Sequence, residues 1–81
     1  MIERKIFPGK YYRHFRGNIY KVIGIATHTE TDEPLVIYQS QYGDFRLFAR
    51  PLSMFAEEID LKKYPESQQK FRFELIDDSG I

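Results

Sequence analysis

Cysteine and tryptophan are both absent from this sequence of 81 residues, and glycine and proline are scarce, with five and four residues. The absence of cysteine excludes disulfides and every metal site that requires a thiolate ligand. No stretch approaches the roughly 18 consecutive apolar residues of a membrane-spanning helix. The N-terminal residues also lack the apolar run of a secretory signal. We therefore expect a cytoplasmic protein without a membrane partner.

The sequence also has no excess of positive or negative charge, because 12 basic and 12 acidic side chains give a formal net charge of zero. A neutral chain has no bulk attraction for nucleic acid, so single-stranded nucleic acid is a weaker candidate than a protein or peptide partner. The charges are nevertheless unevenly spread, because six basic residues and one acid precede residue 29, and six basic residues and eleven acids follow it. Either the two halves pair across the fold, or the first half forms a basic patch.

Aromatic residues, in contrast, are abundant, with seven Phe and six Tyr. A chain this short forms one domain with one core and room for one small site. Each aromatic ring buries about 150–250 Å², so such rings supply a sufficient core without disulfides. We divide the chain into a lead-in over residues 1–9, a single domain over 10–76 and a flexible tail over 77–81.

Alternating apolar residues separated by turn-forming residues predict five strands. The strands are expected at residues 10–15, 19–27, 35–42, 45–49 and 71–76. Residues 19–27 are apolar on both faces, which is typical of a central strand, and Gly24 permits a bend or bulge there. Apolar residues at offsets of three and four after Pro51 predict one or two helical turns. The fold class is therefore mainly all-β, a small five-stranded SH3-like partly open barrel with a short helix before the last strand.

Four segments carry a distinctive pattern. They read Y-R-H-F-R-G-N-I-Y at residues 12–20, A-T-H-T-E-T-D-E at 26–33, V-I-Y at 36–38 and R-P-L-S-M-F at 50–55. Together they resemble a family of small bacterial proteins known as domain of unknown function 1653, over roughly residues 10–76. Phe48 and Ala49 stand where the family usually has Trp and Val, and Phe45 and Arg46 replace what is often a pair of glycines. The resemblance supports the domain boundaries and implies no activity.

The densest polar cluster lies between two predicted strands and reads H-T-E-T-D-E over residues 28–33. A histidine with nearby carboxylates is a plausible metal set, although this spacing matches no standard metal motif. The same threonine and acidic side chains also suit a turn in which they bond to their own backbone. One alternative function is therefore a small metal-dependent or acid/base enzyme that uses His28, Glu30, Glu33 and Arg50. We assign no metal ligand, expect no cofactor, and find no recognisable nucleophile motif.

Arg50 precedes Pro51, which keeps the backbone extended and holds the guanidinium group in a defined direction. The planar guanidinium suits a carboxylate or a phosphate. We expect Arg50 to pair with Glu30 or Glu33, as an ion-paired brace between the polar loop and the Arg50–Pro51 junction. The same pair is alternatively the centre of a site.

Strand alternation places Tyr12 and His14 on one face and Arg13 on the other. Aromatic side chains interleaved with arginine suit the stacking of bases or the binding of a peptide. The leading hypothesis is a non-enzymatic binding module for a peptide or protein partner, and a third interpretation is an oligomer joined through an exposed strand edge. The candidate ligand-binding residues are Tyr12, His14, His28, Glu30, Glu33, Tyr38, Phe48 and Arg50.

Overall fold

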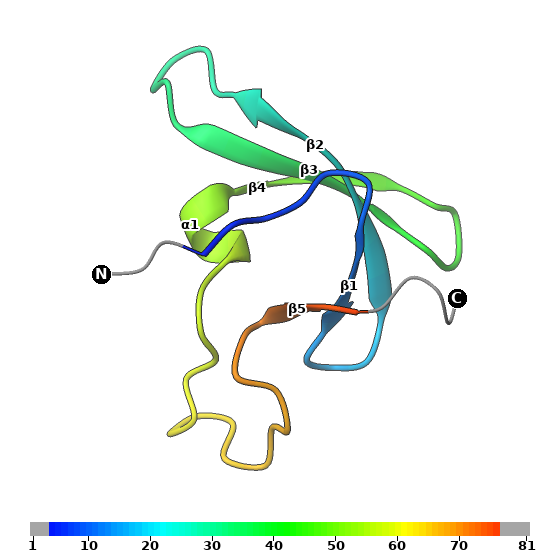
Figure 1. Ribbon diagram of the computed structural model, residues 1–81, viewed down its shortest axis with the longest axis vertical. Helices are drawn as coiled ribbons and strands as arrows, with labels where there is room; N and C mark the ends of the chain where they lie inside the picture. The colour runs from blue at the N-terminus through cyan, green and yellow to red at the C-terminus, as the bar shows by residue number, and fades with distance from the viewer. Residues whose placement is uncertain (1–3, 77–81) are drawn as a thin grey trace.

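A computed structural model describes residues 4–76, which form one antiparallel sheet and one short helix (Figure 1). The strands are β1 (Tyr11–His14), β2 (Ile19–Thr27), β3 (Pro34–Ser40), β4 (Leu47–Pro51) and β5 (Phe73–Leu75), and the helix is α1 (Leu52–Phe55). The sheet has the order β4-β3-β2-β1-β5 and is not closed. The predicted mainly β fold is confirmed, and the arrangement is compatible with an SH3-like partly open barrel. The predicted flexible tail and the first three residues of the lead-in lie outside the described residues.

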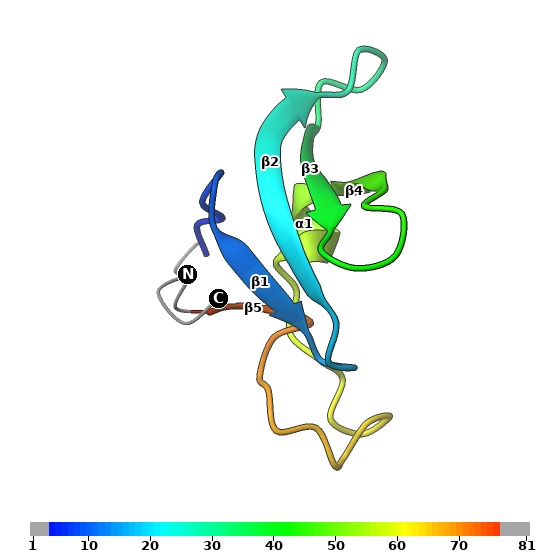
Figure 2. The same cartoon turned by 90° about the vertical axis from the view of Figure 1, so that its right-hand side faces the viewer.

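β2 is the central strand, as its two apolar faces predicted, and it begins and ends where the sequence placed it. The register between β2 and β3 shifts between Val22 and Gly24. An extra residue at such a bulge bends the strand and increases its twist. Figure 2 shows the result, a long curved β2 whose hairpin with β3 extends beyond the rest of the domain. This curvature gives the sheet a concave side that can hold a core.

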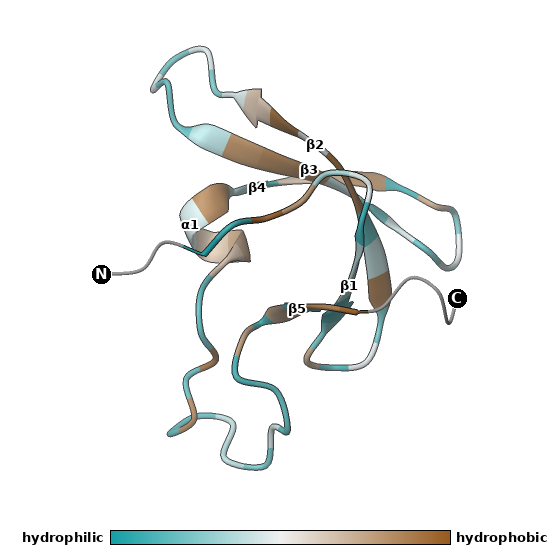
Figure 3. Cartoon of the chain, in the orientation of Figure 1, coloured by the Kyte–Doolittle hydropathy of each residue, from teal (hydrophilic) through white to brown (hydrophobic). Residues whose placement is uncertain are grey.

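Large rings fill the concave side of the sheet. Tyr12 and Phe73 are each 1% exposed, and Phe55 of α1 is completely buried. The rings of Phe55 and Phe73 stack with their centroids 4.1 Å apart, and Tyr12 meets Phe55 edge-on at 5.6 Å. A helix of one turn is not stable alone, so α1 depends on the burial of Phe55. Figure 3 shows that apolar residues gather along β2, β3 and α1, whereas the loops are more hydrophilic and carry only short apolar stretches.

The segment before β1 contributes to this core and to the last strand. Ile6 belongs to the buried cluster. The Arg4 guanidinium donates one hydrogen bond to the Ala56 carbonyl at 3.2 Å and another to the Phe73 carbonyl. It also lies over the Phe71 ring, 4.1 Å from the ring centroid. The lead-in residues from Arg4 onward therefore hold the chain after α1 and β5 together.

The last strand is shorter than the predicted 71–76. Phe71 forms an isolated bridge with Glu58 instead of joining the sheet. β5 pairs with β1, so that His14 lies opposite Phe73 and Arg13 lies opposite Glu74. Residues from opposite parts of the sequence are therefore neighbours at this side of the sheet. Within residues 4–76, no helix is long and apolar enough to cross a membrane.

Candidate functional site

His14, at the end of β1, lies at the centre of the site. Its ring packs against Phe73 at 4.9 Å and against Phe15 at 4.6 Å between centroids. The backbone N–H of Arg16 donates a hydrogen bond to Nδ1 of His14 at 3.2 Å. A neutral imidazole that accepts at Nδ1 carries its proton at Nε2. His14 can therefore offer one N–H donor to a ligand.

The surroundings of His14 are positively charged. Burial lowers the pKa of His14 from 6.5 to about 4, and three nearby positive charges add to this effect. In decreasing order of effect these charges belong to Arg72, Arg50 and Arg16. The ring is thus neutral near pH 7, because protonation would add a fourth positive charge to the group. A neutral histidine among three guanidinium groups suits the binding of an anion.

The three arginines differ in how far their charge is already compensated. Arg72 Nε forms an ion pair with Glu57 Oε1 at 2.7 Å. Arg50 Nε donates to the Tyr38 hydroxyl at 3.3 Å, and the guanidinium carbon of Arg50 lies 5.7 Å from the centroid of the Phe73 ring. Within residues 4–76, neither Arg50 nor Arg16 forms an ion pair. These two side chains therefore keep an uncompensated charge for a ligand.

Aromatic rings adjoin Arg50 along β2, β3 and β4. Tyr38 stacks on Phe48 with centroids 5.5 Å apart, and Tyr20 meets Tyr38 edge-on at 5.4 Å. Burial raises the pKa of Tyr20 to about 12, and its 2.8 Å hydrogen bond with the Tyr42 hydroxyl adds to the shift. Phe48 and Tyr42 remain 37% and 44% exposed, so the outer part of this wall is accessible.

Cross-strand pairing brings these side chains together. Tyr38 lies opposite Phe48, and His14 lies opposite Phe73, and residues directly opposite one another share a face of the sheet. The β1–β5 pair and the β3–β4 pair thus contribute to one concave surface. We call the group the cationic aromatic cluster, and it comprises His14, Arg16, Tyr20, Tyr38, Phe48, Arg50, Arg72 and Phe73.

Of the residues predicted for a ligand face, His14, Tyr38, Phe48 and Arg50 lie on the concave side of the sheet and come from β1, β3 and β4. Tyr12 does not belong to an accessible face, because it is 1% exposed and its hydroxyl accepts a hydrogen bond from the backbone of Phe7 at 2.9 Å. Tyr12 is a core residue because β1 carries it beneath α1, which the sequence alone did not reveal.

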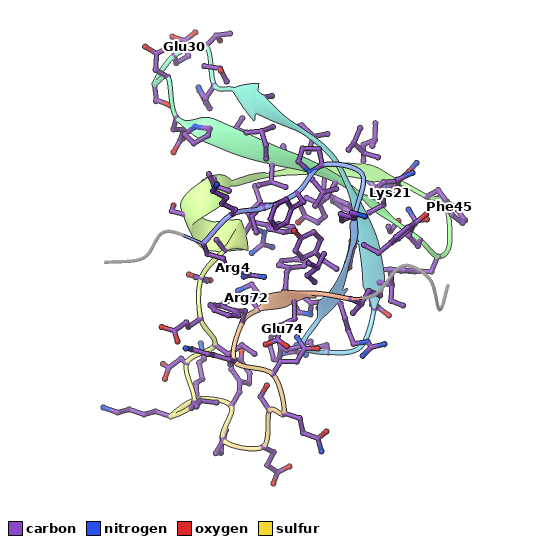
Figure 4. All side chains as sticks on the ribbon, viewed as in Figure 1. Arg4, Lys21, Glu30, Phe45, Arg72 and Glu74 are labelled. Atoms are coloured by element: carbon purple, nitrogen blue, oxygen red, sulfur yellow. The ribbon has the colours of Figure 1, made fainter. Side chains whose placement is uncertain are left out.

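The predicted polar loop satisfies its own hydrogen bonds. His28 Nδ1 accepts from the backbone N–H of Glu30 at 3.1 Å. The backbone N–H of His28 donates to the Glu33 carbonyl at 2.8 Å. The Thr31 hydroxyl accepts from the N–H of Glu33 at 3.3 Å, and Asp32 takes a positive φ of 62°. Figure 4 shows Glu30 at the outer tip of the β2–β3 hairpin, far from Arg72. These hydrogen bonds all lie within residues 28–33, so they stabilise the turn itself.

The ion-paired brace predicted for Arg50 is wrong. Arg50 forms no ion pair with Glu30 or Glu33, because β4 directs its side chain to Tyr38 on the concave side of the sheet. The described residues also hold no group of three His, Asp or Glu side chains placed to bind a metal ion. His28, Glu30, Glu33 and Arg50 therefore do not converge on one site.

Two clefts lie beside the loop that precedes β5. One has a volume of about 580 Å³ and is lined by Arg13, Phe15, Gln69 and Glu74 among other residues. The other has about 530 Å³ and includes Arg16 and Tyr64 in its lining. Arg16 belongs to the cluster, so the second cleft borders it, whereas Arg13 and Glu74 pair on the other face of the β1–β5 pair.

Sequence reasoning missed several members of the cluster, namely Arg16, Tyr20, Arg72 and Phe73. Arg16 and Tyr20 lie within the distinctive pattern at residues 12–20, so that pattern marked them without giving them a role. Arg72 and Phe73 reach the cluster only through the pairing of β5 with β1. No local pattern indicates a pairing between such distant segments.

These features define a small open-sheet domain with a cationic aromatic surface. The family model described as "Protein of unknown function (DUF1653)" matches residues 10–75, and the chain belongs to this family. The crystal structure of a protein of the same family from Bordetella bronchiseptica is similar, with a TM-score of 0.69 and 28% identity over 86% of this chain and 87% of that chain. A comparison with curated proteins gives no significant match. The resemblance inferred from the four sequence segments is thereby confirmed.

Proposed function

We propose that this domain is a non-enzymatic binding module that takes an acidic segment of a protein partner on the cationic aromatic cluster. The observation that carries the proposal is the approach of Arg16, Arg50 and Arg72 to one neutral histidine. Positive charges held together repel one another, and a bound carboxylate interacts favourably with each of them. The cluster is thus poised for an anionic group.

Arg50 is the residue best placed to hold a carboxylate. Its Nε is occupied by the Tyr38 hydroxyl, which fixes the plane of the guanidinium group. The two terminal nitrogens have no hydrogen-bond partner among residues 4–76, so they can bind both oxygens of a carboxylate end-on. The adjacent ring of Phe48, 37% exposed, supplies an apolar contact for the rest of the segment.

A peptide fits this surface better than a nucleic acid does. Nucleic-acid binding draws its affinity from many phosphate contacts along a basic stripe, and this chain has no net positive charge. The cluster offers a few cations beside rings, which matches one or two carboxylates separated by apolar side chains. Binding of a single-stranded oligonucleotide is the competing outcome of the test.

The proposal is tested by fluorescence anisotropy with two labelled probes, an acidic peptide of sequence Thr-Glu-Thr-Leu-Thr-Glu-Thr and an oligothymidine. We expect the peptide to bind, and Arg50→Met to weaken its binding at least about tenfold, the equivalent of roughly 1.4 kcal/mol. Arg13→Met is the matched control, because Arg13 lies on β1 with its side chain on the opposite face, and it should leave binding unchanged. Equal effects of the two variants, or binding of the oligothymidine alone, would contradict the proposal.

A further inference from the structure

The two edges of the open sheet are protected to very different degrees. At the β5 edge, the Phe73 carbonyl accepts from Arg4, and the chain just before β5 is bridged between Phe71 and Glu58. At the β4 edge, no described segment lies beyond the strand in the sheet order. In the sheet order β4 has β3 as its one neighbour, and Figure 1 shows it leading directly into α1. Unpaired strand edges are templates for pairing with another chain.

The backbone groups that face outward from β4 can be identified. The Ser40 N–H donates to the Arg46 carbonyl at 3.1 Å, which sets the phase of the β3–β4 ladder. Hydrogen bonding alternates along an antiparallel pair, so Phe48 bonds toward β3 while Leu47 and Ala49 direct their N–H and C=O groups outward. Within residues 4–76, no other backbone group bonds to these outward groups. Pro51 ends the edge, because it has no N–H to offer.

The β4 edge carries Arg46, Arg50 and Pro51, but the two residues that bond outward from it, Leu47 and Ala49, are not charged. Protective edges carry charged or proline residues, whereas the outward-bonding residues here are apolar, and Leu47 is 62% exposed. Phe45, at the outer end of the β3–β4 hairpin in Figure 4, is 51% exposed. Its φ of 54° lies in the left-handed region, which is strained for a residue with a bulky side chain. The hairpin thus exposes an aromatic side chain at the expense of backbone strain.

We propose that the β4 edge binds an extended segment of a partner protein as an added antiparallel strand. This inference rests on the proposed function and specifies the partner. Residues directly opposite Arg46, Phe48 and Arg50 would share their face of the sheet. Arg46 and Arg50 flank Phe48, and the guanidinium carbon of Arg46 lies 5.9 Å from its ring centroid. The complementary segment carries an acidic, an apolar and an acidic residue at every second position.

A second copy of this chain does not satisfy the same pattern. Antiparallel pairing of two β4 strands centred on Phe48 would place Arg46 of each copy opposite Arg50 of the other. Like charges directly opposite one another destabilise a strand pair, and this arrangement creates two such contacts. In this register, the charges of the edge therefore favour a different chain with carboxylates at those positions.

The test compares the peptide Thr-Glu-Thr-Leu-Thr-Glu-Thr with the same peptide N-methylated at the two threonines that flank the leucine. Methylation removes the N–H groups that would bond to the outward carbonyls of β4 and leaves every side chain in place. We expect at least about a tenfold loss of affinity, which corresponds to roughly 1.4 kcal/mol. In amide hydrogen exchange of the full chain, the parent peptide should slow exchange of Leu47 and Ala49, whereas Phe48 is already bonded and changes little.

A pair of protein variants gives an independent measurement. Ala49→Pro removes an N–H that bonds to nothing within the sheet, so the fold should tolerate it at this edge while peptide affinity falls. Ala49→Val keeps that N–H and is the matched control, with unchanged affinity. The N-methylated peptide needs no change in the protein, so the test holds even if Ala49→Pro fails to fold.

The outcomes separate this inference from the proposed function. Equal binding of the two peptides, without protection of Leu47 and Ala49, would overturn strand addition and leave the acidic-peptide module standing. Absence of binding by both peptides would overturn both proposals. Protection of Leu47 and Ala49 that rises with protein concentration in the absence of peptide would instead identify a second copy as the occupant and contradict the charge argument.

Discussion

The turn after β1 and the loop after β2 each begin with a histidine that makes the same local bond. Nδ1 of His14 accepts from the backbone N–H of Arg16, and Nδ1 of His28 accepts from that of Glu30. The two surroundings nevertheless differ. His14 packs against Phe73 among three guanidinium groups, whereas His28 belongs to a hairpin that extends past the core (Figure 2). The local sequence determines the turn, and the contacts from β5 determine which histidine belongs to the cationic aromatic cluster.

The largest effect is expected from removing the contact that β5 contributes. Phe73→Ala should lower the free energy of unfolding by about 3–5 kcal/mol, because it leaves a cavity against the stacked ring of Phe55. Thr29→Ala in the loop after β2 is exposed and should change this free energy by less than about 0.5 kcal/mol. Urea denaturation measures both, and a loss below about 1 kcal/mol for Phe73→Ala would contradict the central role given to this ring.

A smaller effect is expected from acid. The pKa of His14 in the folded protein is about 4, below the 6.5 of an unperturbed histidine, so the unfolded chain takes up the proton first. Stability should therefore be fully present above pH 6.5 and should fall as the pH drops from 6.5 to 4. The ring is partly exposed, and solvent screening reduces the expected loss to about 1–2 kcal/mol.

This pH dependence is measured by urea denaturation at a series of pH values in wild type, His14→Gln and His28→Gln. Since other groups also titrate in acid, the informative quantity is the difference between each variant and the wild type. His14→Gln should flatten the curve between pH 6.5 and 4 more than His28→Gln does. Identical curves for wild type and His14→Gln would show that the two histidines are equivalent.

The smallest effect on stability is expected from substituting the carboxylates of the loop after β2. Glu33 has no ion pair with Arg50, so the double-mutant cycle of Glu33→Gln and Arg50→Met should give a coupling energy within about 0.5 kcal/mol of zero. Glu30→Gln should likewise leave stability within about 0.5 kcal/mol of the wild type. A coupling energy above about 1 kcal/mol would restore the brace that the contacts of Arg50 exclude.

The fold was largely predictable because strand alternation and turn residues are local features. Residues 19–27 and the helical turn after Pro51 follow from their own periodicity. The site was predictable only where one strand or one hairpin carries it, as with Tyr38 and Phe48, which pair across neighbouring strands. The direction of the Arg50 side chain could not be predicted, because it depends on how the whole sheet curves around the core.

The members of the cluster that come from β5 lay beyond sequence reasoning for a related reason. The pairing of β1 with β5 joins segments from opposite parts of the chain, and no residue pattern encodes their register. The same pairing explains why the acidic loop misled the prediction. Charge complementarity suggested that Arg50 and Glu33 attract one another, but Glu33 lies in the loop that closes the β2–β3 hairpin, where its carbonyl accepts from the backbone N–H of His28.

The position of β1 between β2 and β5 also bears on how the domain is made. The backbone groups of Tyr11 and Phe15 bond to residues at the end of the described chain, as the Phe15 N–H does to the Arg72 carbonyl at 2.9 Å. The N-terminal part of the chain leaves the ribosome first, so these backbone groups can form their hydrogen bonds only after β5 has been synthesised. Arg72 and Phe73 arrive in the same segment. A nascent chain arrested before Arg72 would therefore carry an unfinished sheet and an incomplete cationic aromatic cluster, and both would be completed in one step.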